Sequence, residues 1–346
     1  MTNTVVQILL SILALSILIA WHEFGHYLFA RLCGMRVLQY SIGFGPKLFG
    51  FTRKEIEYRV GVIPVGGYVY IFGMTPLEEG AEQDPKAFIN RPLWARIVVI
   101  AAGPVMNYLL AFVLFVGVFW LWSPSNVPSF LISQVEPNSA AATVGLRSGD
   151  TILRIDGDVV STTSDFLHRI SNSHGQPLHL TVKRGAETFA ATVKAHPGAD
   201  GVYRLGIGYV PESFNFVGAV RESLSQLYLQ SAAILKQLGQ LLYGNADKSQ
   251  FGGVVEITRQ LSNAASQGVK NFLYLSASLS VVLGLFNILP IPSLDGSKIF
   301  ILLIEGIVRR PLPPKAHLWI HGVGILLILA LMLLLTVADI ARIFQR

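Results

Sequence analysis

The chain has 346 residues, of which 52% are hydrophobic and only 14% are charged. Soluble globular proteins carry about 25% charged residues, so this composition disfavours a purely cytosolic enzyme, and its hydrophobicity excludes a disordered chain. The single cysteine, Cys33, excludes an intramolecular disulfide, and the formal net charge of +6 is distributed as membrane topology requires rather than as a nucleic-acid-binding surface.

Four apolar stretches predict membrane-spanning helices, because about 20 mostly apolar residues cross a hydrocarbon core of roughly 30 Å. The first, 5–21, is long enough only when the polar motif HEFGH at 22–26 is included. The second, 97–122, contains no ionisable group, and the other two are 272–292 and 318–338. The first stretch lacks the flanking features of a cleaved signal peptide, so we predict four spans.

The connection between the first two spans contains a predicted β-hairpin. Within 55–72, alternating apolar residues precede a Pro-Val-Gly-Gly turn and a second strand. Gly66 and Gly67 allow the positive φ that the turn needs. We expect this hairpin to associate with the membrane on the cytoplasmic side, where re-entrant backbone is tolerated only if protein covers it.

The distribution of Lys and Arg predicts the topology. Nine lie in the connection 31–96 and four lie between the third and fourth spans, whereas the segment before the first span has none. Both connections are therefore predicted to be cytoplasmic, which places the N-terminus, the region 123–271 and the C-terminus outside. Arg342 and Arg346 count mildly against this orientation.

The region between the second and third spans divides in two. Short alternating strands around one helical stretch near 163–173 predict a small α+β domain over 124–210. Leucines at helical spacing over 212–243 then predict an amphipathic helix in a linker of 211–271. This helix lies either on the membrane surface or against its own domain, and the sequence favours neither.

His22, Glu23 and His26 form HEFGH inside the first span. Two His residues four apart share one face of a helix, where they can bind one zinc ion, and the Glu between them can take a proton from water that the ion activates. Ionisable groups in a membrane span are costly unless they are paired or bind a metal, so we interpret the motif as functional. A polar patch that faces other helices is the alternative.

A zinc site needs a third protein ligand. Position 32 is Leu, so a third His at the metzincin spacing is absent, and Glu55 and Glu57 lie in the predicted hairpin. The remaining candidate is Asp295 in NILPIPSLDG, where two prolines end the third span. Asn287 offers a further donor and acceptor at that depth. For this segment alone, a helix end with a water-exposed Asp is the alternative interpretation.

HEFGH in the first span with NILPIPSLDG in the third closely resembles the site-2 proteases, which are intramembrane zinc metalloproteases of peptidase family M50. GFGP at 43–46, PVGGYV at 64–69 and GPVMN at 103–107 also match, and the likeness is greatest to the bacterial regulator of sigma-E protease group. Residues 135–157 resemble a circularly permuted bacterial PDZ domain, and 124–210 has room for one such domain where the best-known members carry two.

The resemblance implies a zinc (Zn²⁺) endopeptidase of the bacterial inner (plasma) membrane. His22, His26 and Asp295 would hold the metal, Glu23 would be the general base, and Asn287 would bind the substrate strand or the oxyanion. The implied substrates are single-span membrane proteins, such as trimmed anti-sigma factors and leftover signal peptides, and nucleic acid is not a partner. The PDZ-like domain would be extracytoplasmic and either binds peptides by strand addition or only blocks access.

The predicted organisation has four parts. They are 1–123 with two spans, the HExxH motif and the hairpin, 124–210 as the PDZ-like domain, 211–271 as the helical linker, and 272–346 with the last two spans and the LDG motif. A non-catalytic membrane PDZ scaffold with a vestigial metal site is the main alternative, but a structural zinc would not need Glu23. A metal transporter would need ligands on more spans than the first and third.

Overall fold

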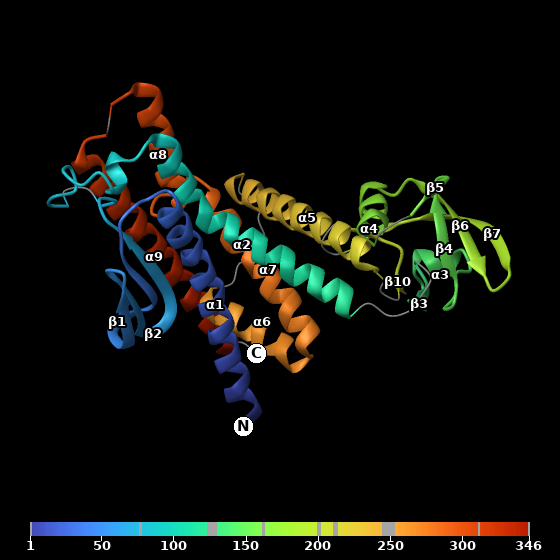
Figure 1. Cartoon of the computed structure of the whole chain (residues 1–346). Helices are drawn as coiled ribbons and strands as arrows, with labels where there is room; N and C mark the ends of the chain where they lie inside the picture. Colours follow the sequence, from blue (N-terminus) through green and yellow to red (C-terminus); the bar gives the residue numbers. More distant parts are fainter. Residues whose placement is uncertain are drawn as a thin grey trace. The chain divides into compact units, whose positions relative to one another are not determined.

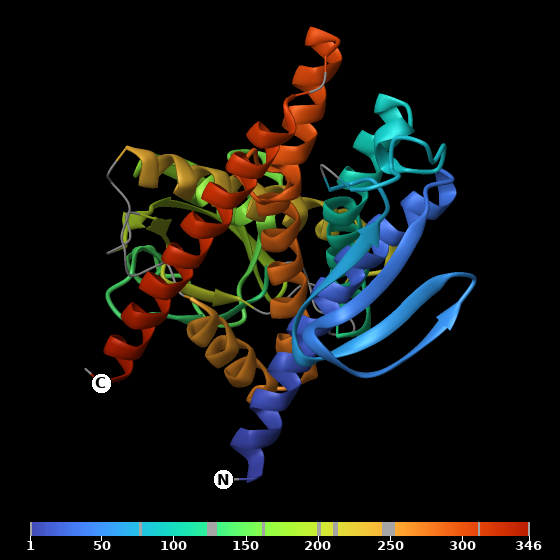
Figure 2. The same ribbon diagram turned by 90° about the vertical axis from the view of Figure 1, so that its left-hand side faces the viewer.

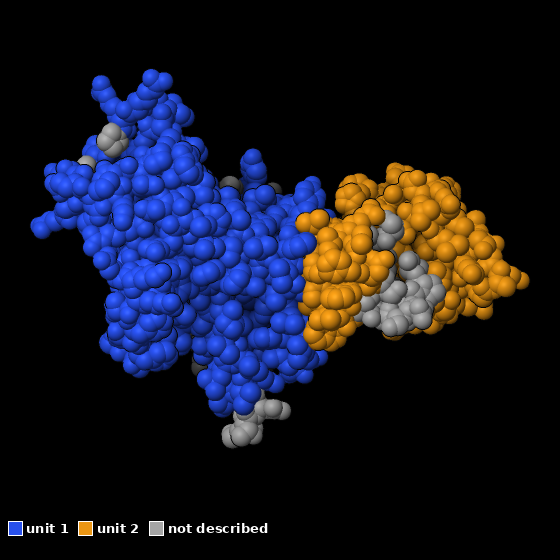
Figure 3. Space-filling view, viewed as in Figure 1, with its two compact units in different colours: residues 1–114, 227–346 blue, residues 115–226 orange. Residues whose placement is uncertain are grey.

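The computed structural model describes residues 2–75, 78–122, 130–160, 163–198, 202–209, 214–243, 253–310 and 312–344. The chain forms two compact units, which are Met1–Leu114 with Leu227–Arg346 (unit 1) and Phe115–Gln226 (unit 2) (Figure 3). The boundaries between the units fall inside two long helices, α2 (Leu93–Leu121) and α5 (Phe216–Leu242).

Unit 1 consists mainly of helices, most of which are rich in apolar residues, and Figure 1 shows these helices. Besides parts of α2 and α5 they are α1 (Thr2–Leu32), α6 (Val254–Ser266), α7 (Val269–Ile288), α8 (Asp295–Val308) and α9 (Pro314–Phe344). Three stretches are long and apolar enough to cross a membrane: Val5–Leu32, Leu93–Leu121 and Val269–Ile288. They correspond to the first three predicted spans. In α9 the apolar stretch is Leu318–Leu334, so the fourth span at 318–338 stays a prediction.

Helix α1 has an exposed face that is apolar and a buried face that carries its polar groups. The exposed positions, four residues apart, are Val5, Leu9, Leu13 and Ile17. The buried positions, also four apart, are Ala14, Leu18, His22, His26 and Ala30. This arrangement suits a membrane helix that has lipid on one side only, with its ionisable side chains facing the protein interior.

Strands β1 (Val37–Arg53) and β2 (Ile56–Ile71) form an antiparallel sheet that packs against α1 (Figure 2). They reverse direction at Lys54 and Glu55, which both have positive φ. The predicted hairpin turn at 64–67 is wrong, because 57–60 and 67–70 pair with opposite sides of 39–42 instead of with each other.

Gly66 has the positive φ expected of it, 114°, but the two parts of β2 do not pair there, because residues 39–42 of β1 lie between them and the ring of Phe44 fills the space at Gly66. A Cβ at this position would overlap the ring of Phe44, and that ring stacks on Tyr68 with centroids 6.2 Å apart. The glycine therefore makes room for an aromatic side chain of β1. Several apolar side chains on this sheet are exposed, and they are Phe44, Leu48, Phe49, Phe51, Val62 and Ile63.

Unit 2 is an α+β arrangement around one apolar core. Its main sheet has the antiparallel order β5 (Asp158–Val159), β4 (Thr151–Ile155), β6 (Pro177–Arg184), β7 (Glu187–Lys194). The smaller pairs are β3 (Ile132–Val135) with β10 (Ile207–Tyr209) and β8 (His196–Pro197) with β9 (Tyr203–Arg204). Besides parts of α2 and α5, its helices are the short α3 (Ala140–Thr143) and α4 (Thr163–Asn172), and α4 occupies the stretch expected to be helical. Phe166 of α4 stacks on Phe130 in the core.

Candidate metal centre

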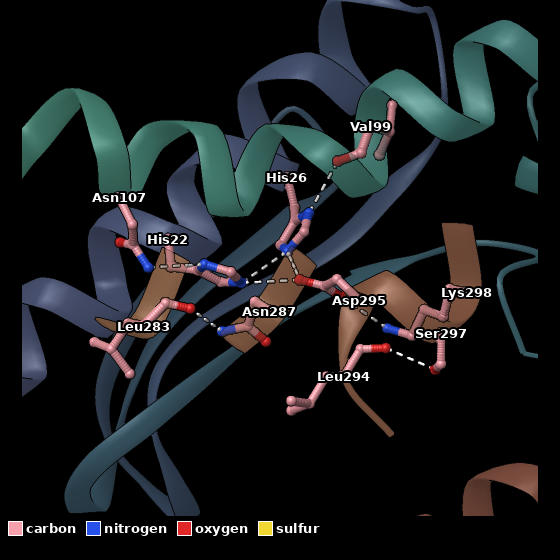
Figure 4. A network of polar contacts seen from close by, with 10 residues as sticks. All are labelled: His22, His26, Val99, Asn107, Leu283, Asn287, Leu294, Asp295, Ser297 and Lys298. Atoms are coloured by element: carbon pink, nitrogen blue, oxygen red, sulfur yellow. Dashed lines mark hydrogen bonds and ion pairs between the residues drawn. The ribbon is translucent and has the colours of Figure 1, made fainter. Parts of the chain in front are cut away.

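Three side chains from α1 and α8 converge inside unit 1 (Figure 4). The Nε2 atoms of His22 and His26 each lie 3.0 Å from Oδ2 of Asp295 and 3.2 Å from each other. Each of the three residues is only 7% exposed. Among the residues that the structure describes, no other group of three His, Cys, Asp or Glu is close enough to hold a metal ion.

Asp295 reaches the histidines because the chain breaks after α7. That helix ends at Ile288, the segment 289–294 turns, and Asp295 begins α8. Asp295 was expected at the end of the third span, and the separate helix α8 was not predicted from the sequence. Gly296 permits the sharp turn, since a Cβ there would overlap the carbonyl oxygen of Ile288. A carboxylate in the first turn of a helix is stabilised by the helix dipole.

Lys298 is a site residue that the sequence motifs did not indicate. Its Nζ lies 3.3 Å from Oδ1 of Asp295, while Oδ2 of the same carboxylate faces both histidines. The two oxygens of Asp295 therefore have different partners. The spacing of three residues on one helix was the available signal, because i and i+3 side chains lie on one face.

His26 is held in the orientation that metal binding needs. Its Nδ1 lies 2.9 Å from the carbonyl oxygen of Val99, and a carbonyl can only accept a hydrogen bond. Nδ1 therefore carries the proton of the neutral ring, and the lone pair of Nε2 points at the centre. A hydrogen bond to the outer nitrogen is what fixes the tautomer and direction of metal-binding histidines.

Glu23 and Asn287 line the same cavity as the three converging side chains, and its volume is about 240 Å³. Glu23 is half-buried, and in the described part of the chain no hydrogen bond or ion pair engages its carboxylate. The Asn287 amide donates to the carbonyl oxygen of Leu283 at 2.9 Å. All five site residues expected from the sequence thus surround one cavity, whereas Glu57 pairs with Lys47 at 2.7 Å.

The donor set fits zinc. Tetrahedral zinc with bonds of about 2.0–2.1 Å separates its ligand atoms by roughly 3.3 Å. The separations here are 3.0–3.2 Å between two imidazole nitrogens and one carboxylate oxygen. Three protein ligands with one open position are typical of catalytic zinc sites.

Comparison with known proteins decides the family. The model of peptidase family M50 matches residues 10–331. The chain belongs to peptidase family M50. This family is zinc-dependent, so the protein is a zinc metalloprotease with apolar, membrane-spanning helices, and the predicted relation to the site-2 proteases is confirmed.

Two relatives are similar to this metalloprotease over nearly their whole length. A protein of Clostridium perfringens is 37% identical over 338 residues, which are 96% of this chain and 98% of the relative. A protein of Agrobacterium fabrum is 33% identical over 356 residues, which are 95% of this chain and 94% of the relative. Both bear the name "Putative zinc metalloprotease". Among solved structures, the chain is similar to the crystal structure of a PDZ domain from an SdrC-like protein of Listeria monocytogenes, with 25% sequence identity. The match covers 25% of this chain and 93% of that chain, and its TM-score is 0.23.

In this metalloprotease, Gly103 of α2 makes room for the two imidazole rings. A Cβ at this position would overlap Nε2 of His26 and would lie 2.8 Å from Cε1 of His22. Both rings are buried and cannot move aside freely. We expect Gly103→Ala to weaken zinc binding by roughly tenfold or more, because the added methyl group would push the imidazole rings out of the orientation in which they can bind a metal.

Chelator competition on the detergent-purified protein measures this effect. Gly117→Ala is the matched control, because Gly117 lies in the same helix and a Cβ there meets nothing within 4 Å. An unchanged zinc affinity in Gly103→Ala would show that the rings do not bind the metal in the described positions.

Proposed function

We propose that this metalloprotease is an intramembrane endopeptidase that cuts single-span membrane proteins. One observation carries the proposal: His22, Glu23 and His26 lie on a helix whose outer face is apolar, and they line one cavity with Asp295. Ionisable side chains are costly to bury in an apolar membrane helix, so their presence in α1 indicates a chemical role. Glu23 argues against the non-catalytic scaffold, since a purely structural metal site needs no base.

The residues that line the cavity have separate roles in peptide hydrolysis. His22, His26 and Asp295 would hold zinc, which supplies Lewis acidity for a carbonyl group and a water molecule. The Glu23 carboxylate takes a proton from the attacking water and later delivers it to the leaving amine. The Asn287 amide, which lines the same cavity, donates a hydrogen bond to the substrate strand or to the developing oxyanion.

A strand beside the cavity supports the choice of substrate. In a helical substrate the backbone carbonyls are engaged in i→i−4 hydrogen bonds, so the segment must unwind before cleavage. Residues 67–71 pair with β1 along one edge, and in the described part of the chain no strand pairs with the other. Tyr68, Val69 and Ile71 of this strand line the cavity. An unwound substrate would add to this edge and so reach the site as an extended strand.

The location of the enzyme follows from charge and exposure. The basic connections favour a cytoplasmic position for 31–96 and an extracytoplasmic position for the PDZ-like domain. The apolar side chains exposed on the β1–β2 sheet suit contact with the bilayer. The compared relatives are bacterial, and we assign the protein to the bacterial inner membrane as a four-span protein.

The test of this function uses the full chain in proteoliposomes. We expect about one zinc per chain and cleavage of a co-reconstituted single-span substrate, and we expect both to be lost with a chelator and restored by zinc. A second substrate, identical except that its span consists of residues with higher helix propensity, serves as the comparison. Its span resists unwinding, so it should be cut more slowly. Zinc binding without cleavage of any membrane substrate would contradict the proposal.

The PDZ-like domain is proposed to act as a size filter, with trimmed anti-sigma factors and signal-peptide remnants as accepted substrates. It contains none of the cavity residues. Replacing 126–209 by a short flexible linker should leave cleavage of a trimmed substrate intact and permit cleavage of an untrimmed one. Immunoblots of cells that express both substrates measure this. Unchanged rejection of the untrimmed substrate, with the trimmed one still cut, would refute the filter.

A further inference from the structure

Asn107 of α2 lies against the outer nitrogen of His22 and is fully buried. Its Nδ2 is 3.1 Å from Nδ1 of His22, and its backbone carbonyl accepts a hydrogen bond of 2.8 Å from Ser280 Oγ on α7 (Figure 4 shows the side-chain contact). Three helices thus fix the place of this amide. Asn107 stands four residues after Gly103, so one face of α2 both makes room for the histidines and contacts one of them.

The contact as it stands defines one tautomer of His22. An amide nitrogen only donates, so Nδ1 accepts and the proton of the neutral ring sits on Nε2, directed at Oδ2 of Asp295 3.0 Å away. This state keeps the cluster hydrogen-bonded without a metal. It also withholds the Nε2 lone pair that zinc would need.

The other atom of the same amide is unsatisfied. Oδ1 of Asn107 is buried and has no hydrogen-bond partner in the described part of the chain. Buried polar atoms are nearly always paired, and an orphaned acceptor calls for an explanation. A half-turn of the amide turns the unsatisfied Oδ1 toward Nδ1 of His22, gives up the one described contact of Nδ2, and moves Nδ2 to the place where Oδ1 had no partner.

We propose that Asn107 is a positioning residue that sets the tautomer of His22 for zinc. In the turned orientation Oδ1 accepts from Nδ1–H, the ring stays neutral with its proton moved from Nε2 to Nδ1, and the lone pair of Nε2 faces the centre. The inference rests on the proposed metal site. The turned amide gives His22 the tautomer that the Val99 carbonyl imposes on His26, with the proton on Nδ1 and the lone pair on Nε2.

An amide is suited to this position because it can donate in one state and accept in the other. The carbonyl of Val99 can only accept, so His26 is ready for metal in both states. Asn107 would satisfy the cluster before zinc enters and would support the ligand afterwards. Hydrogen bonds of this kind change metal affinity by about 10–100-fold when they are removed.

The experiment compares Asn107→Leu with Asn107→Asp in the detergent-purified full chain. Leucine has a similar shape and no hydrogen-bonding group, whereas aspartate keeps the acceptor and loses the donor. We expect Asn107→Leu to weaken zinc binding by about 10–100-fold in chelator competition, and Asn107→Asp to stay within about threefold of the parent. Size-exclusion chromatography checks that each variant is folded, and rescue by aspartate distinguishes an acceptor from a packing role.

A second readout follows the proton directly. In protein labelled with ¹⁵N-histidine, His22 of the metal-free parent should carry its proton on Nε2 and the zinc-loaded parent should carry it on Nδ1. In Asn107→Asp the proton should sit on Nδ1 in both states. Equal zinc affinity of Asn107→Leu and the parent, equal losses in both variants, or a proton that stays on Nε2 would each overturn the inference. These measurements do not use peptide cleavage, so a parent that binds zinc but cuts no membrane substrate would refute the proposed function alone.

Discussion

Glu23→Gln is expected to abolish peptide cleavage while zinc still binds at about one ion per chain. The amide has the size of the carboxylate but cannot take the proton of the attacking water, so a factor of at least 10²–10⁴ in rate should be lost. Zinc binding should survive because Glu23 is not among the three converging donors, and no hydrogen bond or ion pair of the described residues depends on its carboxylate.

Metal analysis and a cleavage assay on the same preparation measure the two quantities together. Glu57→Gln is a useful control, because it removes a carboxylate of the β1–β2 sheet that pairs with Lys47 outside the cavity. Its cleavage rate should stay close to that of the parent. Substantial cleavage by Glu23→Gln would exclude this residue as the general base.

Asp295→Ala should lower zinc affinity and activity together. Two imidazoles alone leave zinc under-coordinated, and the substitution also leaves the Lys298 ammonium without the carboxylate that now lies 3.3 Å away. We therefore expect metal content to fall well below one per chain after dialysis against a weak chelator. Cleavage should fall to the same extent at equal free zinc.

Asn287→Ala separates ligation from substrate binding. Asn287 lies in the same cavity but is not one of the three converging donors, so we expect slower turnover with zinc content unchanged.

If Asp295→Ala bound zinc as tightly as the parent, Asp295 would be excluded as the third ligand, and another side chain would have to supply it. No other cluster of suitable side chains exists among the residues that the structure describes.

The sequence by itself determined the features that depend on neighbouring residues. The composition and the long apolar runs predicted three helices that the structure contains, because the span of a bilayer sets a helix length that can be counted. The spacing of His22 and His26 placed both rings on one face, since the α-helical period is a local property. The two prolines before Asp295 likewise marked the break after α7.

Tertiary structure decided the rest, since it depends on contacts between residues far apart in the chain. Asp295 follows His22 by 273 positions, and it was proposed as a ligand by elimination and resemblance; only the turn before α8 brings its Oδ2 within 3.0 Å. The segment 39–42 is flanked by two parts of β2, and the Phe44 ring fills the space at Gly66; the local turn signal revealed neither feature. Asn107 contacts His22 only because α2 packs against α1, and helix packing is set by the shapes of whole faces rather than by spacing along one chain segment.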